Sequence, residues 1–190
     1  MKRKGFERSK SIRDQVEQGE LEEVEKKEFK EPMHFGSFAH EAYGLAAADR
    51  YENSETEQTI SVLDEEGFHV NDGRIDLIVG EKNIVDFKTN DMREWTTEDA
   101  VKFAKEHGEQ VQGYMNSPDT PEESKGLIVS SVPPKNEEVR KAYAEALADF
   151  GVEVGYSSGE DQDSVMEVVD SFVSEVEPDP PDLEESEDSG

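Results

Sequence analysis

Two runs of β-branched and apolar residues, separated by a short turn signal, constrain the fold of this chain more than any other feature. The runs cover residues 73–79 and 84–89, and Gly80 to Asn83 lie between them. Runs of this kind around a glycine-containing gap predict two neighbouring antiparallel strands. The chain is therefore expected to build a sheet around this pair of strands.

Charged residues interrupt both predicted strands. Period-two alternation in the second strand places Asp86 and Lys88 on one face. Val85 and Phe87 then lie on the opposite face. Antiparallel pairing brings Asp76 of the first strand beside Asp86. Two carboxylates and an ammonium group then converge, which indicates either a site for a hard divalent cation such as Mg²⁺ or a hairpin whose charges face solvent.

The remaining pattern predicts an α/β fold in which helices pack on a mixed sheet. The run at residues 73–79 is expected to be the end of a strand that spans residues 68–79. Further strands are expected at residues 59–64, 126–132 and 152–156, and helices at residues 11–30, 34–51, 96–115, 136–150 and 163–176. Residues 53–58 are expected to form a polar linker, and a β-bulge is expected near Asn71 to Gly73. The final strand–helix–strand order predicts a crossover connection.

Helix boundaries carry clear local signals. Thr96 or Thr97 is expected to cap one helix, Asn136 to cap another, and Gly151 to end the latter. The apolar side chains expected to form the buried side of the 96–115 helix are Val101, Phe103, Ala104, Val111 and Met115.

The net charge of −28 over 190 residues has two explanations, a polyacidic interaction protein or a globular protein adapted to molar salt. Acidic residues are spread through the predicted helices as well as the tail, which favours salt adaptation. At ~1 M salt the Debye length falls to about 3 Å, so net acidity does not exclude a DNA substrate.

Composition also limits the cofactors and the location of the protein. The chain has no cysteine, which excludes disulfides, thiolate zinc sites and a cysteine-ligated iron–sulfur cluster. No apolar stretch is long enough to span a membrane, and Met1 to Lys4 lead into polar sequence rather than a signal-peptide core. A soluble, cytoplasmic protein is expected.

The two ends of the chain differ in charge from one another. Residues 1–30 are expected to hold a basic arm and a helix, residues 31–176 a single domain, and residues 177–190 a disordered acidic tail. The arm has the chemistry to contact phosphates, and a solubilising terminus is the alternative. Its basic residues are Lys2, Arg3, Lys4, Arg8, Lys10 and Arg13.

Two predicted helices carry further polar candidates. His40 lies one turn after Gly36, as either a metal ligand or a partly exposed helical histidine. Gln110 and Tyr114 are four apart and face the same way, as either a catalytic positioning pair or a helix boundary with a tyrosine reaching solvent.

In this order and on these elements, the residues resemble the PD-(D/E)xK nuclease superfamily. The matching patterns are Gly36-x-x-x-His40, Gly73-x-x-Asp76, Asp86-x-Lys88 and Gln110-x-x-x-Tyr114. The two helical patterns are similar to those of the RecB/Cas4-like exonuclease branch, and the resemblance covers roughly residues 34–132. It implies a restriction-endonuclease-like mixed β-sheet core flanked by helices.

The resemblance also implies a role for each matching residue in metal-dependent DNA hydrolysis. Asp76, Asp86, the Phe87 carbonyl and His40 would bind Mg²⁺ or Mn²⁺. Lys88 would orient the attacking water and stabilise charge on the phosphate, while Gln110 and Tyr114 would position the reacting groups.

The chain departs from the family pattern in two places. Asp86 stands where many members have Glu, and the four cysteines of the iron–sulfur members are absent, so no cluster is expected. DNA is the implied partner, with a helicase or another replication or repair protein beside it. An exonuclease of repair, recombination or mobile-element or virus replication is expected, and a non-catalytic DNA-binding or adaptor protein of the same fold is the alternative.

Overall fold

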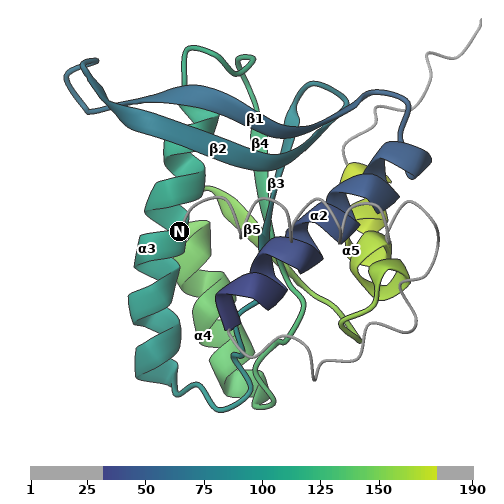
Figure 1. Ribbon diagram of the computed structural model, residues 1–190. Helices are drawn as coiled ribbons and strands as arrows, with labels where there is room; N and C mark the ends of the chain where they lie inside the picture. Colours follow the sequence, from purple (N-terminus) through teal and green to yellow (C-terminus); the bar gives the residue numbers. More distant parts are fainter. Residues whose placement is uncertain (1–31, 175–190) are drawn as a thin grey trace, which may run out of the picture.

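The computed structural model describes residues 32–174, which form five strands and four helices (Figure 1). The elements are α2 (Pro32–Arg50), β1 (Ser54–Leu63), β2 (His69–Val79), β3 (Asn83–Lys88), α3 (Thr97–Met115), β4 (Lys125–Ser130), α4 (Glu137–Ala148), β5 (Val152–Tyr156) and α5 (Gln162–Ser174). The predicted basic arm, the helix at residues 11–30 and the acidic tail lie outside the described residues.

The strands form one mixed sheet in the order β1-β2-β3-β4-β5. Antiparallel pairing joins β1 to β2 and β2 to β3, whereas β3, β4 and β5 run parallel. The parallel pair β4 and β5 is connected through α4, as the predicted crossover requires. The α/β fold class with a mixed sheet and flanking helices is confirmed.

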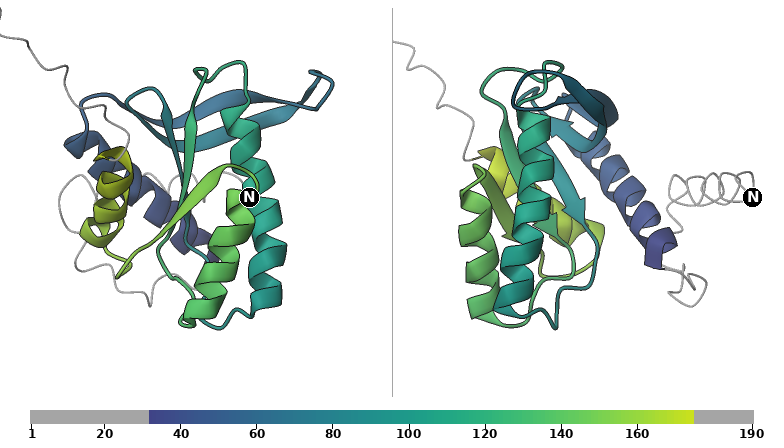
Figure 2. Two further views of the ribbon diagram at one scale, coloured as in Figure 1. Left: turned by 180° about the vertical axis from the view of Figure 1, so that it is seen from behind. Right: turned by 90° about the vertical axis from the view of Figure 1, so that its left-hand side faces the viewer.

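The helices cover both faces of the sheet (Figure 2). On one face, α2 and α5 pack on a core that includes Val85 and Phe87 of β3. On the other face, α3 and α4 pack on a second core that includes Ile128 and Tyr143. The alternation predicted for β3 is therefore confirmed, because Val85 and Phe87 enter the α2 and α5 side.

Local capping signals determine where α3 and α4 begin and end. Thr96 caps α3, its hydroxyl accepting from the Asp99 N–H while the Asp99 carboxylate accepts from the Thr96 N–H. The Asn136 side chain accepts from the Glu138 N–H at the start of α4. Gly151 follows α4 with a φ of +70°, a left-handed conformation that favours glycine. These three predictions are confirmed.

Two expectations about local structure are wrong. Residues 54–58 belong to β1 rather than to a linker, because they pair with the buried end of β2 near Leu77 and Val79. Val101 is 53% exposed rather than buried, because the buried side of α3 follows Ala100, Ala104 and Val111 at helical spacing.

The predicted bulge in β2 is slightly displaced. The register between β1 and β2 shifts between Val62 and Leu63, opposite His69 to Asn71, whereas the sequence indicated Asn71 to Gly73. The irregularity therefore lies nearer to the turn of the β1–β2 hairpin than expected.

The outer edge of β1 is tied to the loop after α3. The Ser61 N–H donates to the Asp119 carboxylate at 2.7 Å, and the Ser61 carbonyl accepts from the Ser117 hydroxyl at 2.7 Å. These bonds use edge groups that would otherwise be open to another strand. None of the helices between residues 32 and 174 is long and apolar enough to cross a membrane.

Candidate active site

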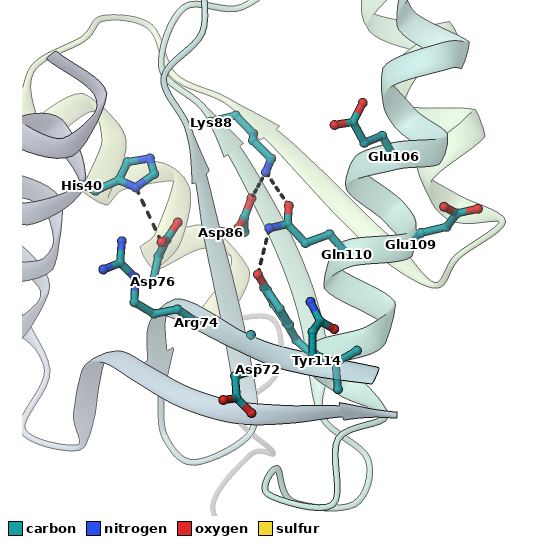
Figure 3. Close-up of a pocket in the computed structure, with 13 residues that line it drawn as sticks. His40, Asp72, Arg74, Asp76, Asp86, Lys88, Glu106, Glu109, Gln110 and Tyr114 are labelled. Atoms are coloured by element: carbon teal, nitrogen blue, oxygen red, sulfur yellow. Dashed lines mark hydrogen bonds and ion pairs between the residues drawn. The ribbon is translucent and has the colours of Figure 1, made fainter. Parts of the chain in front are cut away.

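A cavity of about 670 Å³ lies between α2, the β1–β2 hairpin, β3 and α3 (Figure 3). Its lining comes from His40, Val62, Asn71, Asp72, Gly73, Arg74, Asp76, Asp86, Lys88, Glu106, Glu109, Gln110 and Tyr114. The six side chains singled out in the sequence as polar site candidates all line this one cavity. They come from four separate elements, so folding rather than sequence proximity brings them together.

The two aspartates lie where β2 and β3 stop pairing. The register of the two strands ends at Leu77 and Val85, one position before Asp76 and Asp86. Beyond that point the Asp76 carboxylate accepts the Phe87 N–H at 2.9 Å, a bond that would otherwise belong to the strand ladder. The carboxylate is thereby held against β3, close enough to Asp86 for the two charges to repel each other.

This environment raises the pKa of Asp76 from 3.8 to about 6. Burial is the largest cause, and the negative charge of Asp86 adds to it. His40, the Phe87 N–H and Lys88 act in the opposite direction, because each stabilises the charged carboxylate. The site therefore holds two acids whose mutual repulsion is only partly relieved by the protein.

Asp86 is the more deeply buried of the two acids, at 4% exposure. Its Oδ2 lies 2.7 Å from the Lys88 Nζ in an ion pair, yet the atom is buried without a hydrogen bond of good geometry. The Lys88 ammonium offsets the charge of this oxygen, and the ion pair does not use all the lone pairs of the carboxylate. A cation approaching from the cavity would use the remaining ones.

Lys88 begins a chain of hydrogen bonds that crosses the cavity to α3. Its ammonium donates to the Gln110 Oε1 at 2.9 Å, and the Gln110 Nε2 donates to the Tyr114 hydroxyl at 2.8 Å. Because Gln110 and Tyr114 are one helical turn apart, α3 presents both to the cavity. The chain fixes the orientation of the Gln110 amide and holds the Lys88 ammonium beside the acids.

His40 approaches Asp76 from α2. The His40 Nδ1 lies 3.6 Å from the Asp76 Oδ1, which is too long for a hydrogen bond but within range of ionic attraction. The imidazole is 30% exposed, so it is open to a ligand from the cavity. Packing of Ala39 and Tyr43 against the sheet places this part of α2 over the site.

Phe87 contributes to the site through its backbone. Its side chain packs in the core beneath His40, with the ring centroids 6.4 Å apart. Its N–H is the group that meets Asp76. The predicted role of its carbonyl as a metal ligand stays a prediction.

The donor set suits a hard divalent cation. Two carboxylates and an imidazole line the cavity, and the Asp86 Oδ2 lacks a hydrogen bond. Within residues 32–174, however, no three His, Asp or Glu side chains are already gathered at metal-binding separation. The residues present fit Mg²⁺ or Mn²⁺ by chemistry, and the His40 Nδ1 lies 3.6 Å from the Asp76 Oδ1.

The structure adds lining residues that the sequence patterns did not single out. Arg74 comes from β2 and Glu106 from α3, and both face the cavity in Figure 3. Arg74 is two residues before Asp76, and Glu106 is four before Gln110. Strand and helix periodicity therefore places them on the same faces as these two candidates, a signal that does not by itself show that they line the cavity.

The cavity unites five acids, an imidazole, an ammonium group, a guanidinium group and a Gln–Tyr pair, a set of groups able to bind a cation and a phosphate. No protein-family model, curated protein or solved structure matches the chain.

Proposed function

We propose that this chain is a metal-dependent DNA nuclease that hydrolyses phosphodiester bonds. An exonuclease acting in DNA repair, recombination or mobile-element or virus replication is the form we favour, because the motif order is similar to the RecB/Cas4-like branch. One observation carries the proposal: the buried Asp86 carboxylate, paired with Lys88 at 2.7 Å, lines the same cavity as Asp76 and His40.

The proposed metal is Mg²⁺ or Mn²⁺, held by His40, Asp76, Asp86 and the Phe87 carbonyl. When bound, such an ion lowers the pKa of an attacking water and neutralises charge on the phosphate. The repulsion between Asp76 and Asp86 supports this assignment, since a cation between two carboxylates relieves it.

Lys88 supplies the permanent positive charge beside these acids. Its Nζ is held by Asp86 at 2.7 Å and by Gln110 at 2.9 Å, and its side chain is only 15% exposed. A fixed ammonium in a partly buried site stabilises a developing phosphate charge better than one in water, because little reorganisation is needed. We assign Lys88 to orienting the attacking water and to holding a phosphate oxygen.

Gln110 and Tyr114 act on Lys88 and on the substrate backbone. The Gln110 amide is oriented by its bonds on both sides, so Lys88 cannot rotate freely away from Asp86. The Tyr114 hydroxyl accepts from Gln110, which leaves its own proton available for a phosphate oxygen. DNA is the proposed partner, and a cytoplasmic location with a helicase or another repair protein follows from the same proposal.

A cleavage assay tests this function. Linear single- and double-stranded DNA are incubated with the protein and Mn²⁺ in high salt, and chain shortening is followed. We expect Mn²⁺-dependent cleavage that falls by at least ~10²-fold in Asp86→Asn and in Lys88→Gln, each of which removes a charge from the site. Glu153→Gln removes an exposed acid on β5, outside the cavity, and should retain the wild-type rate.

Three other results would contradict the proposal. Cleavage that survives in both site variants would assign the activity elsewhere. DNA binding without Mn²⁺-dependent cleavage would identify a DNA-binding or adaptor protein. A protein that binds neither DNA nor Mn²⁺ at this site would be an acidic interaction protein.

A further inference from the structure

Charge is distributed unevenly around the cavity. His40 and Arg74 come from α2 and β2 on one wall, and Glu106 comes from α3 on the other (Figure 3). Apart from Lys88, Arg74 is the only Lys or Arg between residues 32 and 174 that lines the cavity. The β2 wall carries the Arg74 guanidinium beside the acids Asp72 and Asp76, whereas the α3 wall carries Glu106 and Glu109. A phosphate chain passing through the cavity therefore meets a cation on the β2 side and carboxylates alone among the charged groups of α3 that line it.

Arg74 is free to contact a ligand. Its side chain is 62% exposed, and the nearest ion-pair partner is the Glu57 Oε1 at 3.8 Å, itself on a 53% exposed side chain. An exposed pair at that separation contributes little stability, so a phosphate can replace Glu57 at small cost. The guanidinium fork is suited to hold two phosphate oxygens at once.

The backbone of Arg74 is well fixed. Gly73 lies under the Tyr114 ring, where an added Cβ would come within 2.7 Å of the Tyr114 Cε1. Asp76, two residues on, is bonded to β3 through the Phe87 N–H. The guanidinium thus extends from an ordered strand, two residues from an acid of the proposed catalytic site.

Glu106, on the α3 wall that faces Arg74, carries the opposite charge and should repel a phosphate. It is exposed on α3, and no cation or hydrogen-bond donor among residues 32–174 pairs with it. Figure 3 shows its carboxylate on the cavity side of the helix, whereas that of Glu109 points away. Glu109 instead lies 4.0 Å from Lys105. An unpaired carboxylate repels phosphate on the α3 side.

We infer that Arg74 binds the phosphate next to the one that is cleaved, and that Glu106 keeps the phosphate chain off the α3 wall. The backbone of the bound strand then runs along α2 and β2, with its bases toward α3. This inference depends on the proposed nuclease function and assigns the orientation of its substrate.

Steady-state cleavage of a DNA oligonucleotide by paired variants tests the inference. We expect Arg74→Ala to raise KM about tenfold and to change kcat less than twofold, because a charged hydrogen bond to the substrate is lost outside the reacting bond. The slope of log affinity against log salt should decrease by about 0.7, the value for one single-strand phosphate contact. Arg74→Lys should recover part of the affinity, since it restores the charge without the fork.

Glu106→Gln should act in the opposite direction and lower KM by about twofold, with the difference disappearing in molar salt. The matched controls lie on α4, where Lys141 and Glu145 form an exposed pair outside the cavity. Lys141→Ala and Glu145→Gln make the same charge changes and should leave KM and kcat at wild-type values. All measurements are made over salt concentrations at which circular dichroism shows each variant folded.

The outcomes separate this inference from the proposed function. Wild-type protein that does not cleave DNA overturns both. Wild-type protein that cleaves, with Arg74→Ala no different from Lys141→Ala in KM and in salt slope, overturns the orientation alone. A fall in kcat at unchanged KM would also overturn it, because Arg74 would then act on the reacting phosphate itself.

Discussion

Two polar clusters lie three residues apart on α3, one around the buried His107 and one around Gln110, which is exposed on the helix, and they differ in what surrounds them. His107 is 9% exposed and shares a hydrogen bond of 2.7 Å with the Tyr143 hydroxyl of α4. The rings of Trp95 and Phe103 pack beside it. Around Gln110, by contrast, the network runs through Lys88 to the buried Asp86 Oδ2, which lies 2.7 Å from the Lys88 Nζ in an ion pair and faces the cavity.

The His107–Tyr143 pair joins two helices, whereas the groups around Asp86 face a cavity that a ligand can enter. The His107 cluster is closed by aromatic side chains, and burial lowers the pKa of His107 to about 3, with a smaller effect from the Lys88 charge. The Asp86 cluster opens into a cavity and contains charges of both signs. A hydrogen-bonded pair enclosed by aromatic rings stabilises the fold, whereas charged groups that line a cavity are able to bind a cation.

Acid titration should affect the His107 cluster most strongly. The folded-state pKa of about 3 lies below the ordinary value of 6.5, so between these values the unfolded chain binds a proton that the folded protein does not. The contribution of neutral His107 to the free energy of unfolding is therefore fully present above pH 6.5 and is lost as the pH falls toward 3. We expect a loss of about 3 kcal/mol from pH 7 to pH 4, relative to His107→Gln.

Denaturant unfolding of both proteins at each pH measures this difference. His107→Gln is the control for the wild type, because the many surface acids titrate equally in the two proteins and their effect cancels in the difference. If the free energies of unfolding of the two proteins changed in parallel with pH, His107 would be protonated in the folded state. The aromatic side chains would then not exclude a proton from the His107–Tyr143 pair.

Binding of Mn²⁺ should stabilise the protein through the groups around Asp86. At 100 times its dissociation constant, Mn²⁺ should stabilise the wild type by about 2.7 kcal/mol, since an ion that binds only the folded state shifts the equilibrium by mass action. Asp86→Asn should lose this gain, whereas Glu153→Gln should keep it. Thermal melting in molar KCl, which screens the acidic surface, provides the measurement. Equal stabilisation of all three proteins would mean that the ion binds the surface generally.

A smaller effect is expected where the hairpin meets α3. In Gly73→Ala the new Cβ would lie 2.7 Å from the Tyr114 ring and 3.0 Å from Val62, so the ring must move, at a cost of about 2 kcal/mol. Gly113→Ala is the matched control, because its Cβ would make an ordinary 3.4 Å contact with Val62. It should be neutral or stabilising by ~0.5–1 kcal/mol.

Urea unfolding of the two alanine variants makes the comparison. If Gly73→Ala were as stable as the wild type, the Tyr114 ring would have room to shift, and the Gln110–Tyr114 bond would not be held by the hairpin.

Local chemistry made much of the fold predictable. The hairpin around Gly80, the Thr96–Asp99 capping box and the left-handed Gly151 each depend on residues only a few positions apart. The strand at residues 54–58 was missed because its side chains are mostly exposed and carry no apolar alternation. Its pairing is imposed by the buried end of β2, a partner distant in sequence.

The candidate site divides in the same way. Asp76 and Asp86 followed from the register of one hairpin, and Gln110 and Tyr114 from helical spacing. Their meeting with His40 depends on how α2 packs across the sheet, which no local pattern specifies. Arg74 and Glu106 were missed because exposed charges have many possible positions, and only the cavity shows which ones face it.

The bonds from Ser61 to Asp119 and Ser117 have a further consequence for the cavity. They join the hairpin that carries Arg74 and Asp76 to the loop that follows Gln110 and Tyr114, so these two walls form a single preorganised frame. A substrate therefore meets groups already spaced by folding, and the reorganisation energy that a closing lid would require is avoided on this side.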